Sequence, residues 1–201
     1  MERSRMEAFS DGVLAIIITI TVLSLKVPAG REFSDIVGVL PQIGSYALSF
    51  AYIGAYWSNH HHTLHTVTRV NGKILWSNLL FLFAISLLPF ATDWFGQNLF
   101  QPVPTLVYGL VLFFTAASFF LLRLAIITQD QNSHVLRKVM ESDWRGTVTG
   151  AVYLVALGLA MFAPKVSVAL YTVLLVLWFM PDRKLERALD GEDGGQKGRM
   201  G

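Results

Sequence analysis

Six long stretches without a single charged residue limit most strongly how this sequence can fold. They cover residues 12–25, 36–68, 74–92, 94–122, 146–164 and 166–181. A helix needs about 20 apolar residues to cross the roughly 30 Å hydrocarbon core of a bilayer, and most stretches qualify if Pro41, Pro102 and Pro104 lie at helix starts. The last stretch would give only about 24 Å of helix and requires snorkelling or a thinner bilayer. We therefore predict an all-α integral membrane six-helix bundle.

The composition agrees with a membrane protein and excludes several kinds of site. Of the 201 residues, 53% are hydrophobic and only 15% are charged, which a soluble domain of this size could not easily bury. Cysteine is absent, so the chain has no disulfides, no thiolate metal site and no thiol nucleophile. A formal net charge of +2 does not indicate a nucleic-acid partner.

The basic residues predict the orientation of the chain in the membrane. With six spans, one side holds Arg3, Arg5, Arg69, Lys73, Arg123, Arg137, Lys138, Arg145, Arg183, Lys184, Arg187, Lys197 and Arg199, and the other holds Lys26, Arg31 and Lys165. The positive-inside rule makes the first side cytoplasmic. We therefore expect a multi-pass protein of the cell (plasma) membrane with both termini cytoplasmic.

The beginning of the chain could also be interpreted as a signal peptide. Residues 13–25 would be its apolar core and residues 27–30 its cleavage region. An acidic residue directly before the apolar core, Asp11, is unusual in such peptides. A retained first helix also gives the better charge distribution, and we favour it.

Asp11 must lie close to membrane depth. The fourteen uncharged residues between Asp11 and Lys26 form only about 21 Å of helix. A carboxylate at that depth costs roughly 2.5–3.5 kcal/mol unless it is paired or faces water. Arg5 is one candidate partner, although a spacing of six is imperfect on one helix, and a donor on another helix is the alternative.

One face of the first helix carries a continuous stripe. Gly12, Ile16, Thr19, Ile20, Leu23 and Val27 recur at helical spacing. Such a stripe can face a core, lipid or a pore, and a membrane threonine can satisfy its hydroxyl on a carbonyl one turn earlier. Periodicity alone does not show whether the stripe faces a core, lipid or a pore.

The string Arg5-Met6-Glu7-Ala8-Phe9-Ser10-Asp11-Gly12 contains Arg-x-x-x-Phe-Ser-Asp-Gly. It resembles the signature that opens the first helix of the transmembrane protein 175 family of potassium channels. The resemblance extends over the chain as one six-helix repeat. It implies a potassium-permeable cation channel, assembled as a homotetramer with its pore lined by the first helix.

The resemblance also implies roles for individual residues. Ile16 would form the constriction, Thr19 would contribute to potassium selectivity, and Ile20 and Leu23 would form further rings. The network around the motif would consist of Arg5, Phe9, Ser10, Asp11, Gly12, Trp57, Asn59, His60 and Asn78. Buried polar groups near a helix start need donors and acceptors from neighbouring helices, and imidazole and amide groups supply both.

The organisation that follows is simple. Residues 1–187 form one six-transmembrane-helix channel domain, in which 129–143 is the only sizeable polar loop, and 188–201 form a disordered cytoplasmic tail. The expected partners are three further copies of the chain, the lipid bilayer and permeating monovalent cations. No cofactor, no catalytic residue and no metal beyond permeating potassium is expected.

Histidines suggest two other kinds of site. His61 and His65 are four residues apart and can share a helix face as zinc ligands do, but no carboxylate or cysteine follows at ligand spacing. Ser10, Asp11 and a histidine are the residue types of a hydrolase. Adjacent residues on a helix point about 100° apart, however, which does not give the required relay.

Two other transport mechanisms are alternatives to a pore lined by the first helix: a carbonyl-lined filter and a secondary transporter. Residues 105–109, Thr-Leu-Val-Tyr-Gly, superficially resemble a carbonyl-lined potassium filter, but they continue into apolar helix where the carbonyls stay in intrahelical bonds. A proton-coupled secondary transporter is the stronger alternative, because an Asp at membrane depth with nearby histidines also builds proton relays. No internal repeat or interrupted pair of helices supports it.

Overall fold

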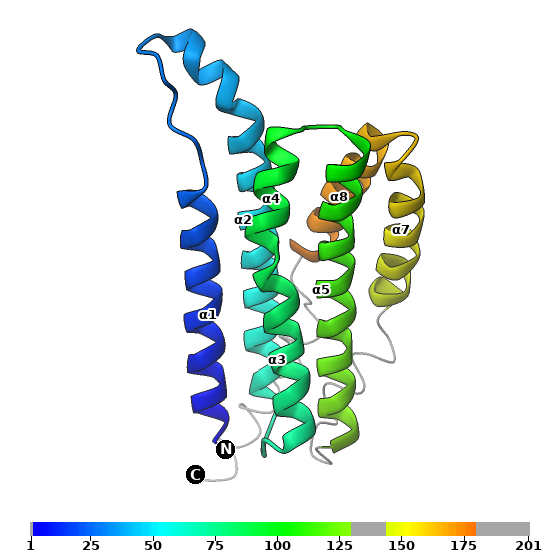
Figure 1. Cartoon of the computed structure of the whole chain (residues 1–201). Helices are drawn as coiled ribbons and strands as arrows, with labels where there is room; N and C mark the ends of the chain where they lie inside the picture. Colours follow the sequence, from blue (N-terminus) through cyan, green and yellow to red (C-terminus); the bar gives the residue numbers. More distant parts are fainter. Residues whose placement is uncertain (1, 130–143, 180–201) are drawn as a thin grey trace, which may run out of the picture.

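The structure, a computed structural model, describes residues 2–129 and 144–179, and these residues are helical apart from their connections. The helices are α1 (Arg3–Leu23), α2 (Phe33–His65), α3 (Gly72–Ser86), α4 (Leu88–Gln97), α5 (Pro102–Gln129), α7 (Trp144–Ala160) and α8 (Pro164–Phe179). Figure 1 shows the long helices running side by side as a bundle. The predicted all-α fold is confirmed for these residues. Residues 130–143 of the predicted loop and the predicted tail 188–201 lie outside them.

Four helical segments are long and apolar enough to cross a membrane: residues 3–23, 33–65, 72–97 and 102–128. The segment 72–97 combines α3 and α4, which meet at Leu87. Pro89 stands in the first turn of α4, where a proline needs no amide hydrogen. The apolar helix α8 has 16 residues and is shorter, as predicted for the last stretch. The protein is therefore multi-pass.

Proline was a reliable marker at the start of one helix and misleading at another. α5 begins at Pro102, as predicted. The prediction that Pro41 begins a helix is wrong, because α2 begins at Phe33 and runs through it. A reciprocal capping box between Glu32 and Asp35 fixes this earlier start. The 33-residue helix is about 50 Å long, and Figure 1 shows its first turns projecting past the neighbouring helices.

Hydroxyl groups join three helices in the core of the bundle. Ser49 on α2 lies 2.7 Å from the Thr92 hydroxyl on α4 and 3.0 Å from the Tyr108 hydroxyl on α5. All three residues are buried, and Phe95 stacks on the Tyr108 ring at 4.9 Å between centroids. Buried hydroxyls are tolerated where they find such partners. This core leaves α1 at one edge of the bundle, packed on α2, α3 and α4.

Candidate functional site

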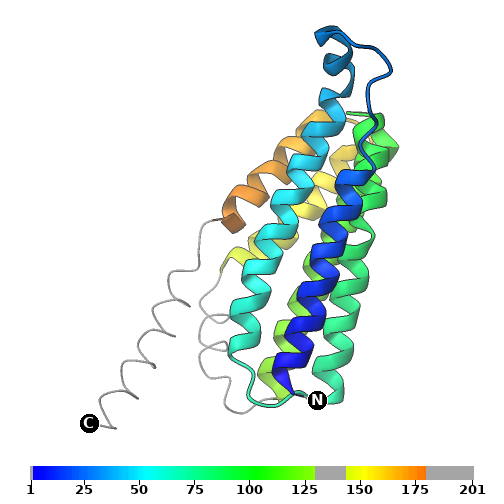
Figure 2. The same ribbon diagram turned by 90° about the vertical axis from the view of Figure 1, so that its left-hand side faces the viewer.

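The helix α1 has one covered and one uncovered face. Its buried residues are Met6, Ser10, Leu14, Ile17 and Thr21, which recur at intervals of three or four and face the other helices. In Figure 2, which is turned so that α1 faces the reader, no other described helix lies in front of it. The face that remains is free for lipid or for another molecule.

The predicted stripe lies on this uncovered face. The exposed fraction is 57% for Ile16, 50% for Ile20 and 81% for Leu23, and Thr19 is also exposed. Ile17, the residue directly after Ile16, is only 4% exposed. The two neighbours therefore point in different directions, one into the bundle and one away from it.

Gly12 and Phe9 continue the uncovered face toward the start of α1. Phe9 is 55% exposed, and a side chain added at Gly12 would meet no atom of the chain within 4 Å. Arg5 is exposed as well. Packing within one chain therefore does not explain why this position is a glycine.

Thr19 keeps its hydroxyl oxygen available as an acceptor. Its hydroxyl donates to the Ile16 carbonyl oxygen at 2.8 Å, as a membrane threonine often does. A hydroxyl oxygen that donates one hydrogen bond still has lone pairs, and here they lie on an exposed position of the helix. The intrahelical bond and a role as a cation ligand are therefore compatible.

A buried hydrogen-bonded chain links α1, α3 and α2. The Ser10 hydroxyl donates to the Met6 carbonyl oxygen at 2.8 Å and accepts from the Asn78 amide nitrogen at 2.9 Å. The Asn78 amide oxygen lies 2.7 Å from Nε2 of His60. Because that oxygen can only accept, Nε2 of His60 carries the proton. All three residues are at most 1% exposed, so losing Asn78 would leave Nε2 of His60 buried without a partner and the Ser10 hydroxyl with only its bond to Met6.

Asp11 and Trp57 form a second contact between α1 and α2. The Trp57 indole nitrogen donates to the Asp11 carboxylate at 3.0 Å. The partner thus comes from another helix, which was the second of the two expected arrangements. Among the described residues Arg5 forms no ion pair with Asp11. Asn59, also expected in the network, donates to the Ala55 carbonyl of its own helix at 2.8 Å instead.

The geometry supports neither the hydrolase hypothesis nor the hypothesis of a carbonyl-lined potassium filter. Ser10 is bonded to Asn78 and a backbone carbonyl, and Asp11 to Trp57, so no Ser-His-Asp relay forms within the described part of the chain. Residues 105–109 lie inside α5, where their carbonyls belong to the helix.

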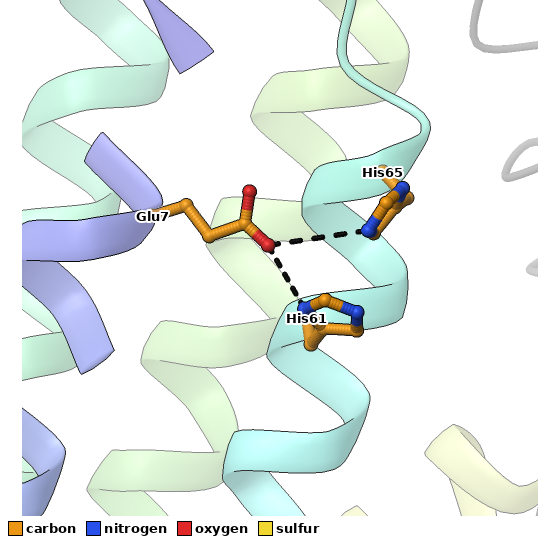
Figure 3. Close-up of side chains that lie close together, drawn as sticks. All are labelled: Glu7, His61 and His65. Atoms are coloured by element: carbon orange, nitrogen blue, oxygen red, sulfur yellow. Dashed lines mark ion pairs between the residues drawn. The ribbon is translucent and has the colours of Figure 1, made fainter. Parts of the chain in front are cut away.

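Glu7 joins a group that the sequence did not predict. Its carboxylate lies 2.8 Å from Nδ1 of His61 and 4.0 Å from Nε2 of His65 (Figure 3). The spacing of these residues along α1 and α2 is the sequence signal that could have indicated this contact. Glu7 lies one helical turn before Asp11, just as His61 lies one turn after Trp57, so the Asp11–Trp57 contact implies a second contact one turn away.

Comparisons with known proteins agree with the resemblance. The sequence profile described as "Endosomal/lysosomal potassium channel TMEM175" matches residues 5–89. A potassium channel of Chryseobacterium sp. (strain P1-3) is 40% identical over 189 residues, which make up 94% of this chain and 98% of that protein. A potassium channel of Streptomyces collinus (strain DSM 40733 / Tue 365) is 36% identical over 126 residues, or 59% of this chain and 61% of that one.

A solved structure supports the same assignment. It is the crystal structure of a lysosomal potassium-selective channel TMEM175 homolog from Chamaesiphon minutus, with a TM-score of 0.77 and 27% sequence identity. The match covers 91% of this chain and 98% of that chain. The profile and these relatives are described as channels, which confirms that the chain is not an enzyme.

Proposed function

This chain belongs to the TMEM175 family of potassium channels, and on that basis we propose that it forms a potassium-permeable cation channel. The observation that carries the proposal is the uncovered face of α1. The face contains the exposed Ile16 and the exposed hydroxyl of Thr19. One chain has a single α1 and cannot enclose a pore with it, so the channel requires several copies.

We assign four copies to the channel, with their α1 helices around a common axis. Ile16, Ile20 and Leu23 then form hydrophobic rings, and Thr19 forms a ring of hydroxyls. Gly12 lies on the same face, where the absence of a side chain allows a neighbouring copy to approach closely. The other five spans of each chain, with α3 and α4 counted as one, surround these four helices.

Conduction then depends on a hydrophobic constriction rather than on a cage of carbonyls. A ring of Ile16 side chains offers no ligands to replace the hydration shell of an ion and can close by dewetting. Ion selectivity then depends on the pore diameter, on ion hydration and on the Thr19 oxygens. We expect these to give a modest preference for potassium over sodium. The channel needs no cofactor beyond the permeating ion.

The hydrogen-bonded chain of Ser10, Asn78 and His60 supports the pore helix. It is buried on the opposite side of α1 from the exposed stripe and ties α1 to α2 and α3. We place the channel in the cell membrane with both termini cytoplasmic, in accord with the basic residues on that side.

Ion flux into liposomes that contain the purified protein tests the proposal. We expect potassium flux above that of protein-free liposomes, slower sodium flux and little flux of larger cations. Thr19→Val should reduce the discrimination between potassium and sodium, whereas the control Thr21→Val, on the buried face, should retain it. Absence of cation flux would overturn the proposal, and flux that saturates with substrate and requires a pH gradient would favour the transporter.

A further inference from the structure

We propose that Glu7, His61 and His65 form a binding site for a divalent transition metal ion of the zinc class. The three side chains come from two helices, Glu7 from α1 and both histidines from the last turns of α2. Figure 3 shows the carboxylate pointing between the two imidazole rings. One ligand atom from each residue lies within 4.8 Å of the other two.

The distances fit tetrahedral coordination after small side-chain movements. Zinc bonds to histidine nitrogen and carboxylate oxygen are about 2.0–2.2 Å long, which separates tetrahedral ligand atoms by about 3.4 Å. The carboxylate oxygen of Glu7 is 2.8 Å from His61 Nδ1 and 4.0 Å from His65 Nε2. One separation must widen and the other must narrow, each by roughly 0.6 Å, which rotation of partly exposed side chains provides.

The ligand types select the kind of metal. Two imidazoles and one carboxylate suit zinc, cobalt, nickel or copper, whereas magnesium and calcium prefer sites made of oxygen atoms alone. Three protein ligands leave the fourth position for water, as in zinc sites built from two histidines and a glutamate. The histidine side chains are 42% and 44% exposed and that of Glu7 is 19% exposed, so an ion can reach the site from water.

The backbone holds the ligands near one another before the metal binds. His61 and His65 are one turn apart on α2, with ring centroids separated by 4.5 Å. Arg3 on α1 donates to the His65 carbonyl oxygen at 3.1 Å, and Trp57 donates to Asp11 two turns before His65 along α2. Contacts on both sides of Glu7 therefore fix α1 and α2 at this level, which lowers the entropic cost of bringing the ligands together.

A metal bound here joins α1 to α2. If α1 is the pore helix, as in the proposed function on which this consequence rests, the bound ion directly restrains the position of that helix. Metal binding itself does not depend on conduction and can be measured on protein that carries no current.

The test uses full-length protein purified without a histidine tag. Titration with cobalt(II) should give the visible absorption of a tetrahedral ion, which zinc should abolish, with one metal per chain. Zinc should also raise the unfolding temperature, because a ligand that binds only the folded state stabilises it. Magnesium should do neither.

Single substitutions identify the ligands. His61→Ala, His65→Ala and Glu7→Gln should each weaken zinc binding by more than about tenfold, since removing a ligand costs at least as much as removing a residue that supports one. His62→Ala is the matched control, because His62 is a neighbouring histidine outside the group, and it should bind zinc as the unchanged protein does. If Glu7→Gln fails to assemble, the exposed His65 still provides the test.

Two results would overturn the site: no saturable zinc binding, or binding that these three substitutions leave unchanged. The contact would then be only an ion pair between Glu7 and His61. Parallel flux measurements separate this outcome from a failure of the proposed channel. Zinc binding without cation flux would contradict the proposed channel and support the metal site. Cation flux without zinc binding would contradict the metal site and support the channel.

Discussion

Ile16 and Ile17 are neighbours in sequence but occupy opposite environments, and this makes them a matched pair for mutagenesis. Ile16→Asn should increase ion flux and weaken ion discrimination, because a polar ring keeps the constriction wet. Ile17, which is 4% exposed, lies against the other helices. Ile17→Asn should therefore leave ion preference intact but destabilise the fold by roughly 1–3 kcal/mol, since its amide enters an apolar site without partners.

Liposome flux and thermal unfolding in detergent measure the two effects. The informative comparison uses variants that assemble to a similar extent. If Ile17→Asn alters ion preference and Ile16→Asn does not, the face of α1 that lines the pore has been assigned wrongly.

Asn78 joins two buried polar groups, the Ser10 hydroxyl and the His60 imidazole, by hydrogen bonds. Asn78→Leu should lower the stability of the folded protein by about 1–3 kcal/mol, because Nε2 of His60 loses its acceptor and is left buried, while Ser10 keeps its bond to the Met6 carbonyl. The control is Asn59→Leu, whose amide bonds only within α2. Equal losses of thermal stability in the two variants would show that the chain from Ser10 to His60 has no special role.

Residue by residue, the sequence predicts directions on one helix better than contacts between helices. The stripe on α1 follows from the 100° turn per residue, so the sequence alone could separate Ile16 from Ile17. The contact of Glu7 with His61 depends on the register of α1 against α2. No local pattern contains that register. The sequence alone also does not show that the Asn59 amide bonds within α2 rather than to α1.

At the level of helices, the boundaries depend on capping groups more than on proline. The residues that start α2 are Glu32 and Asp35, which satisfy each other's backbone groups, and the helix then tolerates Pro41 at the loss of one hydrogen bond. The long uncharged stretches did predict the membrane-length segments, because hydrophobicity over many residues outweighs local signals.

Close packing between α5 and α8 yields a prediction about a single glycine. A side chain at Gly109 would collide with the hydroxyl end of the buried Tyr171. Gly109→Ala should therefore destabilise the protein by about 1–3 kcal/mol, the usual cost of overpacking. Gly158→Ala on α7 meets nothing within 4 Å and should be neutral or stabilising, because alanine favours helix. Thermal unfolding in detergent measures both, and a stable Gly109→Ala variant would contradict the packing.

At the scale of the whole molecule, the absence of cysteine allows a direct test of topology. Arg31 lies in the connection between α1 and α2, and Lys73 lies in the first turn of α3. With cytoplasmic termini, Arg31→Cys should react with a membrane-impermeant maleimide in intact cells, whereas Lys73→Cys should react only after permeabilisation. Labelling of both residues from outside would contradict the proposed orientation.

The proposed arrangement of four α1 helices around an axis predicts which surfaces meet between copies. Leu23, at 81% exposed, is the least covered of the stripe residues that were assigned to pore rings. A cysteine at Leu23 or Ile20 would approach its counterparts in neighbouring copies, and disulfides form where the Cβ atoms come within about 3.5–4.5 Å. Mild oxidation should therefore join these variants into covalent dimers within an assembly of about 90 kDa, four times the 22.4 kDa chain.

Val155 provides the control for this experiment. It is 57% exposed on α7, at the side of the bundle far from α1 in Figure 1, so it faces lipid in the proposed assembly. A cysteine there is as accessible as one in the stripe, but oxidation should leave Val155→Cys monomeric on a denaturing gel. Exposure alone would crosslink both positions, whereas a central axis lined by α1 crosslinks only the stripe. Dimers from Val155→Cys and none from Leu23→Cys would therefore place α1 outside the assembly and remove it from the pore.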